Sequence, residues 1–274
     1  MVLYFIGLGL GDETDITVKG LEAVKKSKRV YLENYTSILG ISKDKLEKFY
    51  GKELIVAYRE TVEIEMDSIL EEISKDLDSD FSFLVVGDPF CATTHSDLFL
   101  RAHKLGITVR VIHNASIMNA IGATGLMLYR FGETVSIPFY QGEWRPYSFL
   151  DKIVKNYKNG SHTLVLLDIR VREISNKNLA LGKDIYEPPH FMSCKVAVEQ
   201  ILEAEENLKT GVFTDELNCV GVARMGFDDQ KIASGSLKDF LDIDMGEPLH
   251  SFIICAKDIH EIEMEMFDHF RNKK

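Results

Sequence analysis

The sequence predicts an α/β protein of two domains, in which a mainly parallel sheet with helices on both faces precedes a mixed α+β sheet domain. Three observations lead to this prediction. The chain has 274 residues, more than most single domains hold, so two domains of roughly 100 to 150 residues are expected. Its first half alternates short apolar, β-branched runs with stretches of helical period, which is typical of parallel βαβ units. Its second half loses that regular spacing.

The elements of the first half follow from this alternation. The expected strands are 3–9, 29–33, 54–59, 81–87 and 109–113, and the expected helices are 17–26, 43–50, 62–77 and 96–104. Strands that are apolar along almost their whole length are buried on both faces, so this half should form a helix-covered parallel sheet.

The second half begins with a small-residue helix that opens at Asn114. We place the domain boundary near Ala115, so that the domains span 1–114 and 115–274. The expected strands are then 134–139, 163–169, 218–225 and 249–255, the helices 148–157, 193–208 and 259–270, and the long loops 140–147 and 172–192. Such uneven spacing favours a mixed sheet.

Composition excludes several classes of protein. The net charge is −11, from 43 acidic and 32 basic residues, and a negative surface repels phosphate backbones, so a nucleic-acid substrate is disfavoured. The cysteines lie far apart, with no CxxC pair and no zinc-type histidine spacing, so we expect reduced thiols and no metal; they are Cys91, Cys194, Cys219 and Cys255. No signal peptide precedes the short apolar start, and no apolar run approaches the ~20 residues that span a bilayer, so we expect a cytoplasmic protein without a membrane anchor.

A glycine-rich loop follows the first expected strand. Gly7, Gly9 and Gly11 stand between that strand and the helix that starts near Thr17. Glycine permits positive φ and close backbone approach, which loops that bind nucleoside cofactors need. The GxGxG spacing fits a dinucleotide less well than another adenosine cofactor, because the dinucleotide fingerprint is GxGxxG. A tight turn without a ligand remains the alternative.

Two further loops should reach the same carboxyl edge of the sheet. Gly87 and Asp88 follow the fourth strand, and Asn114 and Ser116 follow the fifth. Asp88 can accept hydrogen bonds from a ribose or an amine, and we expect it and Gly9 on an exposed loop edge. The structural alternatives are a Gly-Asp-Pro turn with Thr94 or Ser96 capping the next helix, and an N-cap at Asn114 or Ser116.

Other polar residues at strand ends have two interpretations each. Glu33 ends the second strand, where it could hold ribose hydroxyls or be a solvated loop residue beside Tyr35-Thr36-Ser37. Arg170 and Arg172 could bind a substrate carboxylate or lie on a solvated face. Leu167 and Met225 are core by default, His250 is more often a satisfied structural histidine, and 228–231 is most simply a solvated turn.

Taken together, the motifs resemble a known family. Eight stretches span nearly the whole chain in order: YFIGLGLGDETDITVKGLEAV, VYLENYTS, FLVVGDPFCATTHSDLFLRA, VIHNASIMNAIG, HTLVLLDI, IYEPPHFMS, VGVARMGFDDQKIASG and MGEPLHSFII. They are similar to the diphthine synthase family of tetrapyrrole-methylase-like methyltransferases, in its eukaryotic branch. The resemblance implies two α/β domains, a homodimer, and S-adenosylmethionine bound in the cleft between the domains. It also implies three N-methylations and one carboxylate methylation of an amino-carboxypropyl-histidine on translation elongation factor 2.

The resemblance also supplies the expected cofactor contacts. They are Leu10, Asp88, Cys91, Ser116, Ile117, Leu167, Met225 and His250. Cys91 replaces the glycine expected after GDPF, and Met225 replaces a smaller aliphatic residue, which a contact made by the backbone would tolerate. Methyl transfer from a sulfonium needs chiefly alignment and a dry pocket, so no catalytic acid or base is assigned. The alternatives are a methylase of tetrapyrroles or ribosomal RNA, and a non-catalytic adenosine-binding regulator.

Overall fold

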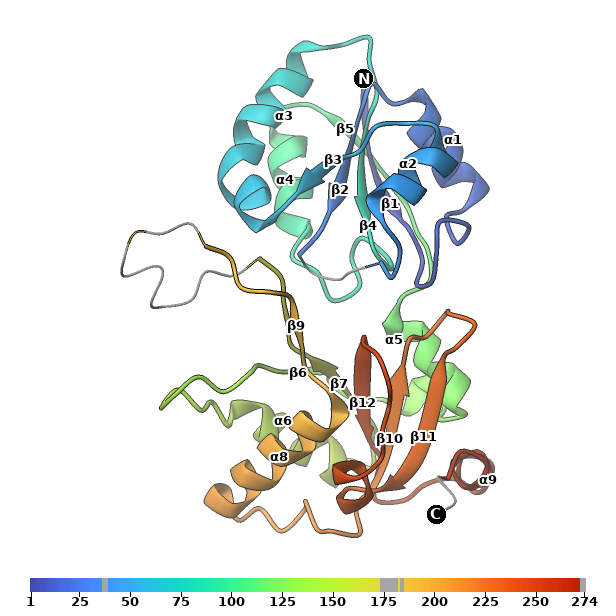
Figure 1. Ribbon diagram of the computed structural model, residues 1–274, viewed down its shortest axis with the longest axis vertical. Coiled ribbons are helices and arrows are strands. Elements are labelled where there is room, and N and C mark those ends of the chain that lie inside the picture. Colours follow the sequence, from blue (N-terminus) through green and yellow to red (C-terminus); the bar gives the residue numbers. More distant parts are fainter. Residues whose placement is uncertain (36–38, 173–181, 183–184, 272–274) are drawn as a thin grey trace. The chain divides into compact units, whose positions relative to one another are not determined.

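The computed structural model describes residues 1–35, 39–172, 182 and 185–271. The chain forms two compact units, Met1–Met118 and Asn119–Lys274, and each is described by itself (Figure 1). The two expected long or polar loops at 35–37 and 172–192 lie in part outside the described residues.

The first unit is built on a five-stranded sheet in the order β3-β2-β4-β1-β5. All of its strand pairs are parallel. The strands are β1 Val2–Gly7, β2 Arg29–Glu33, β3 Ile55–Ala57, β4 Phe81–Val85 and β5 Thr108–Ile112. The helices are α1 Val18–Lys26, α2 Lys43–Tyr50, α3 Met66–Lys75 and α4 Ser96–Lys104.

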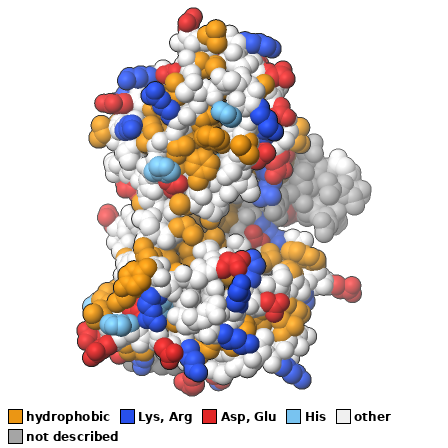
Figure 2. Space-filling model, turned by 180° about the vertical axis from the view of Figure 1, so that it is seen from behind, with side chains coloured by type: hydrophobic (Ala, Val, Ile, Leu, Met, Phe, Trp, Pro, Cys, Tyr) orange, Lys and Arg blue, Asp and Glu red, His pale blue; other side chains and the backbone are white. Residues whose placement is uncertain are grey.

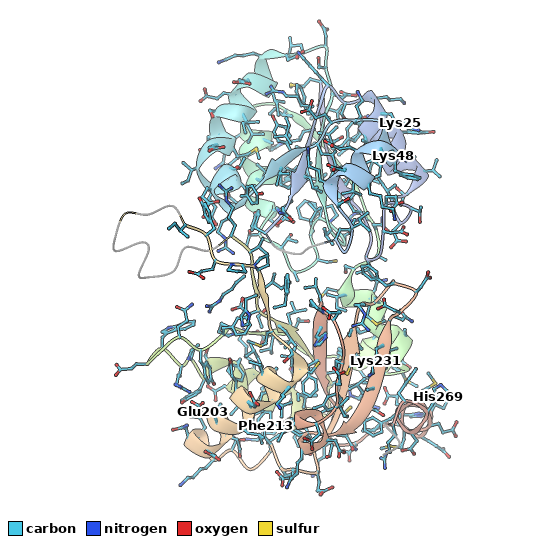
Figure 3. The ribbon with its side chains drawn as sticks, viewed as in Figure 1. Lys25, Lys48, Glu203, Phe213, Lys231 and His269 are labelled. Atoms are coloured by element: carbon cyan, nitrogen blue, oxygen red, sulfur yellow. The ribbon has the colours of Figure 1, made fainter. Side chains whose placement is uncertain are left out.

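Helices cover both faces of this sheet because successive strand residues point to opposite sides. Phe5 packs with Leu70 of α3 and Leu98 of α4, whereas its neighbour Ile6 packs with Val24 of α1 and Leu46 of α2. Lys25 and Lys48 lie on the exposed sides of α1 and α2 (Figure 3). The expected parallel sheet with helices on both faces is therefore confirmed.

Local capping explains where these helices begin. The Thr17 side chain accepts a hydrogen bond from the Gly20 amide at the start of α1, and Ser42 does the same for Lys45 at the start of α2. The expected helix 62–77 differs, because its first turn, Thr61–Glu65, is a π-helix and α3 begins only at Met66.

The second unit contains a five-stranded mixed sheet in the order β11-β10-β12-β7-β6. Only β6 and β7 pair in parallel, and the other pairs are antiparallel. The strands are β6 Val135–Ile137, β7 Thr163–Leu167, β10 Asn218–Ala223, β11 Lys231–Ser236 and β12 His250–Ile254. The helices are α6 Ser148–Lys158, α8 Cys194–Leu208 and α9 Glu261–His269, and the short α5 Ile117–Ala120 begins in the first unit and ends in the second. The core of this unit includes Phe213, Phe240 and Phe252.

Several details of the second unit differ from the sequence prediction. The sequence does not predict β11, because Lys231–Ser236 contains small and polar residues; its strand partner is β10, and Ser234 also forms an isolated bridge with Arg271. Lys231 marks the start of β11 in Figure 3. The expected strand 163–169 is interrupted at Asp168, after which β8 Ile169–Arg170 pairs with β9 His190–Phe191. The expected small-residue helix is one α-helical turn followed by the 3-10 turn Ile121–Thr124.

Candidate cofactor site

The loop after β1 is fixed against the loop after β4. The Gly9 amide donates to the Gly87 carbonyl at 3.2 Å, and the Gly87 amide donates to the Gly9 carbonyl at 2.7 Å. Gly9 has φ +78°, and a Cβ there would lie 2.6 Å from the Cβ of Asp15. Glycine is therefore required at position 9 by both backbone conformation and space.

Asp15 shapes the same loop from within. Its Oδ2 accepts hydrogen bonds from the Leu10 amide at 3.2 Å and from the Gly11 amide at 2.7 Å. The Leu10 amide is thus already used inside the protein. A contact from Leu10 to a cofactor would have to come from its carbonyl or its half-buried side chain.

Asp88 joins the loop after β4 to the loop after β5. Its Oδ1 accepts from the Phe90 amide at 3.0 Å, and its Oδ2 accepts from the His113 ring at 2.8 Å and from the Asn114 amide at 3.2 Å. Burial disfavours the charged carboxylate, but these hydrogen bonds outweigh it and hold the pKa of Asp88 below its usual value. Asp88 therefore stays ionised at neutral pH.

The expected exposure of this edge is wrong for two residues. Asp88 is 5% exposed, and Gly9 is buried as well. Both are covered because the loops hydrogen-bond to one another instead of extending separately into solvent.

Asn114 completes the connection between the loops. Its side-chain amide donates to the carbonyls of Gly7 and Asp15, each at 2.9 Å. The N-cap of α5 is Ser116, whose hydroxyl accepts from the Met118 amide at 3.2 Å. The sequence identifies Asn114 only as a possible cap and gives no role to Asp15; the available signal was that Asn and Asp side chains in loops commonly hydrogen-bond to nearby backbone groups.

The structure thus gathers the predicted residues of the first unit at the carboxyl ends of β1, β4 and β5. Besides Leu10, Asp88 and Ser116, they include Cys91, which is half-buried and whose amide donates to the Asp88 carbonyl at 3.3 Å, and Ile117, which begins α5. The convergence of three loops, expected from the strand order, is confirmed.

The predicted residues of the second unit also meet at one edge of their sheet. Leu167 ends β7, Met225 follows the end of β10, and His250 starts β12, which is antiparallel to both strands. Ala223 is the register partner of His250, and the Arg224 amide donates to the Leu249 carbonyl at 3.0 Å. Leu167 and Met225 are 7% and 6% exposed, as expected for core residues.

His250 is fully used within the second unit. Its Nε2 lies 3.0 Å from the carbonyls of both Gly246 and Glu247, so this nitrogen must carry the proton. Its Nδ1 accepts from the Cys194 amide at 3.4 Å. Burial lowers the pKa of His250 despite these carbonyls. The ring is therefore neutral at pH 7, which supports its interpretation as a satisfied structural histidine.

The remaining strand-end residues are also engaged. Glu33 is 1% exposed and accepts from the Tyr35 amide at 2.9 Å, so it is not a solvated loop residue. Arg170 lies 3.5 Å from the Asp168 carboxylate and stacks over Phe139, and Arg172 stacks over the Tyr186 ring.

All four cysteines are free thiols, and burial raises the pKa of Cys194 to about 12. Within the described ranges, no group of three or more His, Cys, Asp or Glu side chains is arranged to hold a metal ion. No helix in the described part of the chain is long and apolar enough to cross a membrane. On the face drawn in Figure 2, acidic and basic side chains are interspersed.

Comparison with known proteins places these features in a family. A family model described as tetrapyrrole (corrin/porphyrin) methylases matches residues 2–241. This match defines the class of protein as a methylase of the tetrapyrrole methylase type.

Individual relatives narrow the class. The chain is 60% identical to the human diphthine methyl ester synthase, with 98% of this chain and 95% of the human protein covered. It is 55% identical to the Dictyostelium discoideum protein of the same name, over the full length of both. A crystal structure of diphthine synthase matches with a TM-score of 0.84 and 33% identity, and covers 99% of this chain and 96% of that one. The chain belongs to the tetrapyrrole methylase family and, within it, to the diphthine methyl ester synthases.

Proposed function

We propose that this chain is an S-adenosylmethionine-dependent methyltransferase that forms the methyl ester of diphthine on translation elongation factor 2, a step of diphthamide biosynthesis. The acceptor is an amino-carboxypropyl-histidine, on which three methyl groups go to the amine and one to the carboxylate. The observation that carries this proposal is the 60% identity over 98% of the chain to a protein named diphthine methyl ester synthase.

The converging loops suit S-adenosylmethionine chemically. The cofactor carries a sulfonium and an ammonium, and the ionised carboxylate of Asp88, buried at the edge of β1, β4 and β5, favours positive charge nearby. We assign the cofactor contacts of the first unit to Leu10, Asp88, Cys91, Ser116 and Ile117.

The second unit would supply the remaining contacts. We assign these to Leu167, Met225 and His250, which lie together at one edge of its sheet. Because both ring nitrogens of His250 are used internally, its contact would be made by the ring face or the backbone.

The reaction needs little from ionisable side chains. The bound cofactor supplies a methyl group made electrophilic by its sulfonium. The protein has to hold the acceptor in line and exclude water, and hydrogen-bonded loops can do this without a catalytic base. An amine acceptor releases a proton when it is methylated, whereas a carboxylate does not.

The test is direct methyl transfer. The chain is incubated with labelled S-adenosylmethionine and elongation factor 2 from cells that lack this activity, and the product peptide is analysed by mass spectrometry. Four added methyl groups would support the proposal in full. Binding of the cofactor without any transfer would favour a non-catalytic regulator, and transfer only to a tetrapyrrole or ribosomal RNA would favour another branch of the family.

We further propose that the enzyme is a cytoplasmic homodimer, because its proposed acceptor is a translation factor and the family resemblance implies a dimer. Light scattering coupled to size-exclusion chromatography should give a mass near twice 31.1 kDa. A mass that stays near the monomer value at micromolar concentration would contradict the dimer.

A further inference from the structure

A second group of side chains lies at the carboxyl edge of the first sheet. Two of them follow β2 and β3, whose loops contain none of the proposed cofactor contacts. Tyr35 stands two residues after β2, Arg59 stands two residues after β3, and His95 precedes α4. The Arg59 guanidinium carbon lies 5.6 Å from the centre of the Tyr35 ring. The His95 ring meets the same ring edge-on, with the ring centres 6.3 Å apart. We call these three residues the Tyr35 cluster.

Arg59 differs from most arginines of the chain. Most of the other arginines form ion pairs with Asp or Glu. These are Arg29, Arg101, Arg130, Arg145, Arg170, Arg224 and Arg271. Among the described residues, exposed Arg59 has no carboxylate partner, and its guanidinium rests on Tyr35, which is 9% exposed. Stacking on an aromatic ring orients a guanidinium while leaving its N–H groups available for a planar anion.

His95 provides a second, independent sign of a ligand. The expected caps Thr94 and Ser96 are wrong: His95 is the N-cap residue of α4, but its side chain makes no capping hydrogen bond. Its Nδ1 lies 3.0 Å from the Pro89 carbonyl, which can only accept, so Nδ1 carries the proton. Its Nε2 is therefore a buried acceptor, and it has no hydrogen-bond partner in the part of the chain that the structure describes. Buried polar atoms without a partner are rare and point to a ligand or water.

His95 also ties the cluster to the proposed cofactor loop. The Pro89 carbonyl that it contacts directly follows Asp88 in the chain. The Tyr35 cluster and the Asp88 loop thus lie at neighbouring strands of one parallel sheet, in the order β3-β2-β4-β1-β5. A π-helical turn, a form frequent at functional sites, begins at Thr61 just after Arg59.

We propose that the Tyr35 cluster is the methyl-acceptor subsite, in which Arg59 binds the carboxylate of the amino-carboxypropyl arm. This inference rests on the proposed function. Guanidinium and carboxylate match in shape and pair through two parallel hydrogen bonds. When the carboxylate is esterified, its oxygen bonds to the methyl carbon as the carbon–sulfur bond breaks, with the electrons staying on sulfur and no proton lost. The ester group carries no charge, so Arg59 no longer holds it.

The first experiment measures steady-state methyl transfer by Arg59→Gln and Arg59→Lys. The acceptor is elongation factor 2 from cells that lack the activity, and Arg110→Gln is the control. Arg110 is exposed on β5 and, among the described residues, likewise has no carboxylate partner. Arg59→Gln should raise KM for the acceptor about tenfold or more, because a charged hydrogen-bonded pair is lost. Arg59→Lys should have a smaller effect, and Arg110→Gln none.

The second experiment separates recognition of the carboxylate from other roles of Arg59. Binding is compared between elongation factor 2 carrying the free-acid arm and the same factor carrying the methyl ester. The wild-type chain should bind the free acid about tenfold more tightly, and Arg59→Gln should bind the two forms equally. S-adenosylmethionine affinity, measured by calorimetry, and the melting temperature should remain close to wild type in Arg59→Gln.

Two results would overturn the inference while leaving the proposed function intact. One is an Arg59→Gln variant whose KM matches that of Arg110→Gln while the wild type transfers methyl groups normally. The other is an Arg59→Gln variant that still prefers the free acid as strongly as wild type. If the wild-type chain transfers no methyl group to elongation factor 2, the proposed function and this inference fall together.

Discussion

Replacing Asp88 by alanine tests the hydrogen bonds that join the loops of the first unit. The carboxylate accepts from the Phe90 amide at 3.0 Å, from the Asn114 amide at 3.2 Å and from the His113 ring at 2.8 Å. Alanine would leave both backbone amides without an acceptor. The variant should therefore lose stability as well as cofactor affinity.

The size of the loss follows from the exposure of these partners. An amide left unsatisfied in a protein interior costs about 1 to 3 kcal/mol, and both amides are only part-buried, so water can replace some of the bonding. The His113 side chain is 72% exposed and contributes little. We expect Asp88→Ala to lower the free energy of unfolding by about 2 to 4 kcal/mol. Asp88→Asn should cost about half as much, because its remaining oxygen can still accept from Phe90.

The assay is urea unfolding followed by circular dichroism, with Asp78→Ala as the control because that side chain is exposed. Since the pKa of Asp88 is lowered in the folded protein, its contribution is present above the unfolded value of about 3.9 and is lost as pH falls through the folded value. The difference between Asp88→Ala and wild type should therefore shrink in acid below about pH 4. An Asp88→Ala variant as stable as Asp78→Ala at pH 7 would refute the interpretation of Asp88 as the link between these loops.

Three further predictions concern other buried groups. In chemical denaturation, Gly9→Ala should destabilise the protein by about 1 kcal/mol or more beyond Gly142→Ala. Both glycines have positive φ, but only at Gly9 would a Cβ meet a neighbour, 2.6 Å away, so equal losses of stability would contradict the crowding. Glu263→Gln should lower the free energy of unfolding by about 2 to 4 kcal/mol, because the fully buried carboxylate pairs with Arg130 and accepts from the Met127 and His260 amides. A melting temperature like that of wild type would argue against this. Stability should fall as pH drops below about 6.5, because three histidines have pKa values lowered by burial and take up protons more readily in the unfolded chain. A melting temperature that stays constant between about pH 7.5 and 5.5 would contradict this. These are His95, His162 and His250.

The sequence was most informative where the hydrophobic pattern was clear. β2, α2 and α4 begin and end at the predicted residues, and at α2 the pattern is reinforced by Ser42 before the helix and Gly51 after it. The converging loops were also predictable, since the carboxyl ends of parallel strands meet at one edge.

Features that depend on contacts between distant residues could not be predicted from the sequence. β11 could not be predicted from Lys231–Ser236, because its sequence is not strand-like and its position depends on pairing with β10. The burial of Asp88 and Gly9 was likewise hidden, because it depends on hydrogen bonds to Asn114 and Gly87, which are distant in the sequence or on another loop. The tautomer of the His95 ring also depends on the position of the Pro89 carbonyl, six residues earlier, which the sequence does not show.

The way in which the polar groups are used bears on how the site would work. The Leu10 amide is bound to Asp15. One oxygen of Asp88 accepts from Phe90 in its own loop and the other from the loop after β5, and both nitrogens of His250 are occupied. Side-chain polar groups of the predicted contacts are thus spent largely on fixing the loops. Backbone carbonyls and apolar side chains remain for the cofactor, which explains why leucine, isoleucine and methionine could serve at such positions. Because methyl transfer depends on alignment more than on proton transfer, rigidity of this kind is the main contribution that these residues can make. Substitutions in the hydrogen-bonded network should therefore act on the reaction through the shape of the loops, whereas Arg59 should act through the charge of the acceptor.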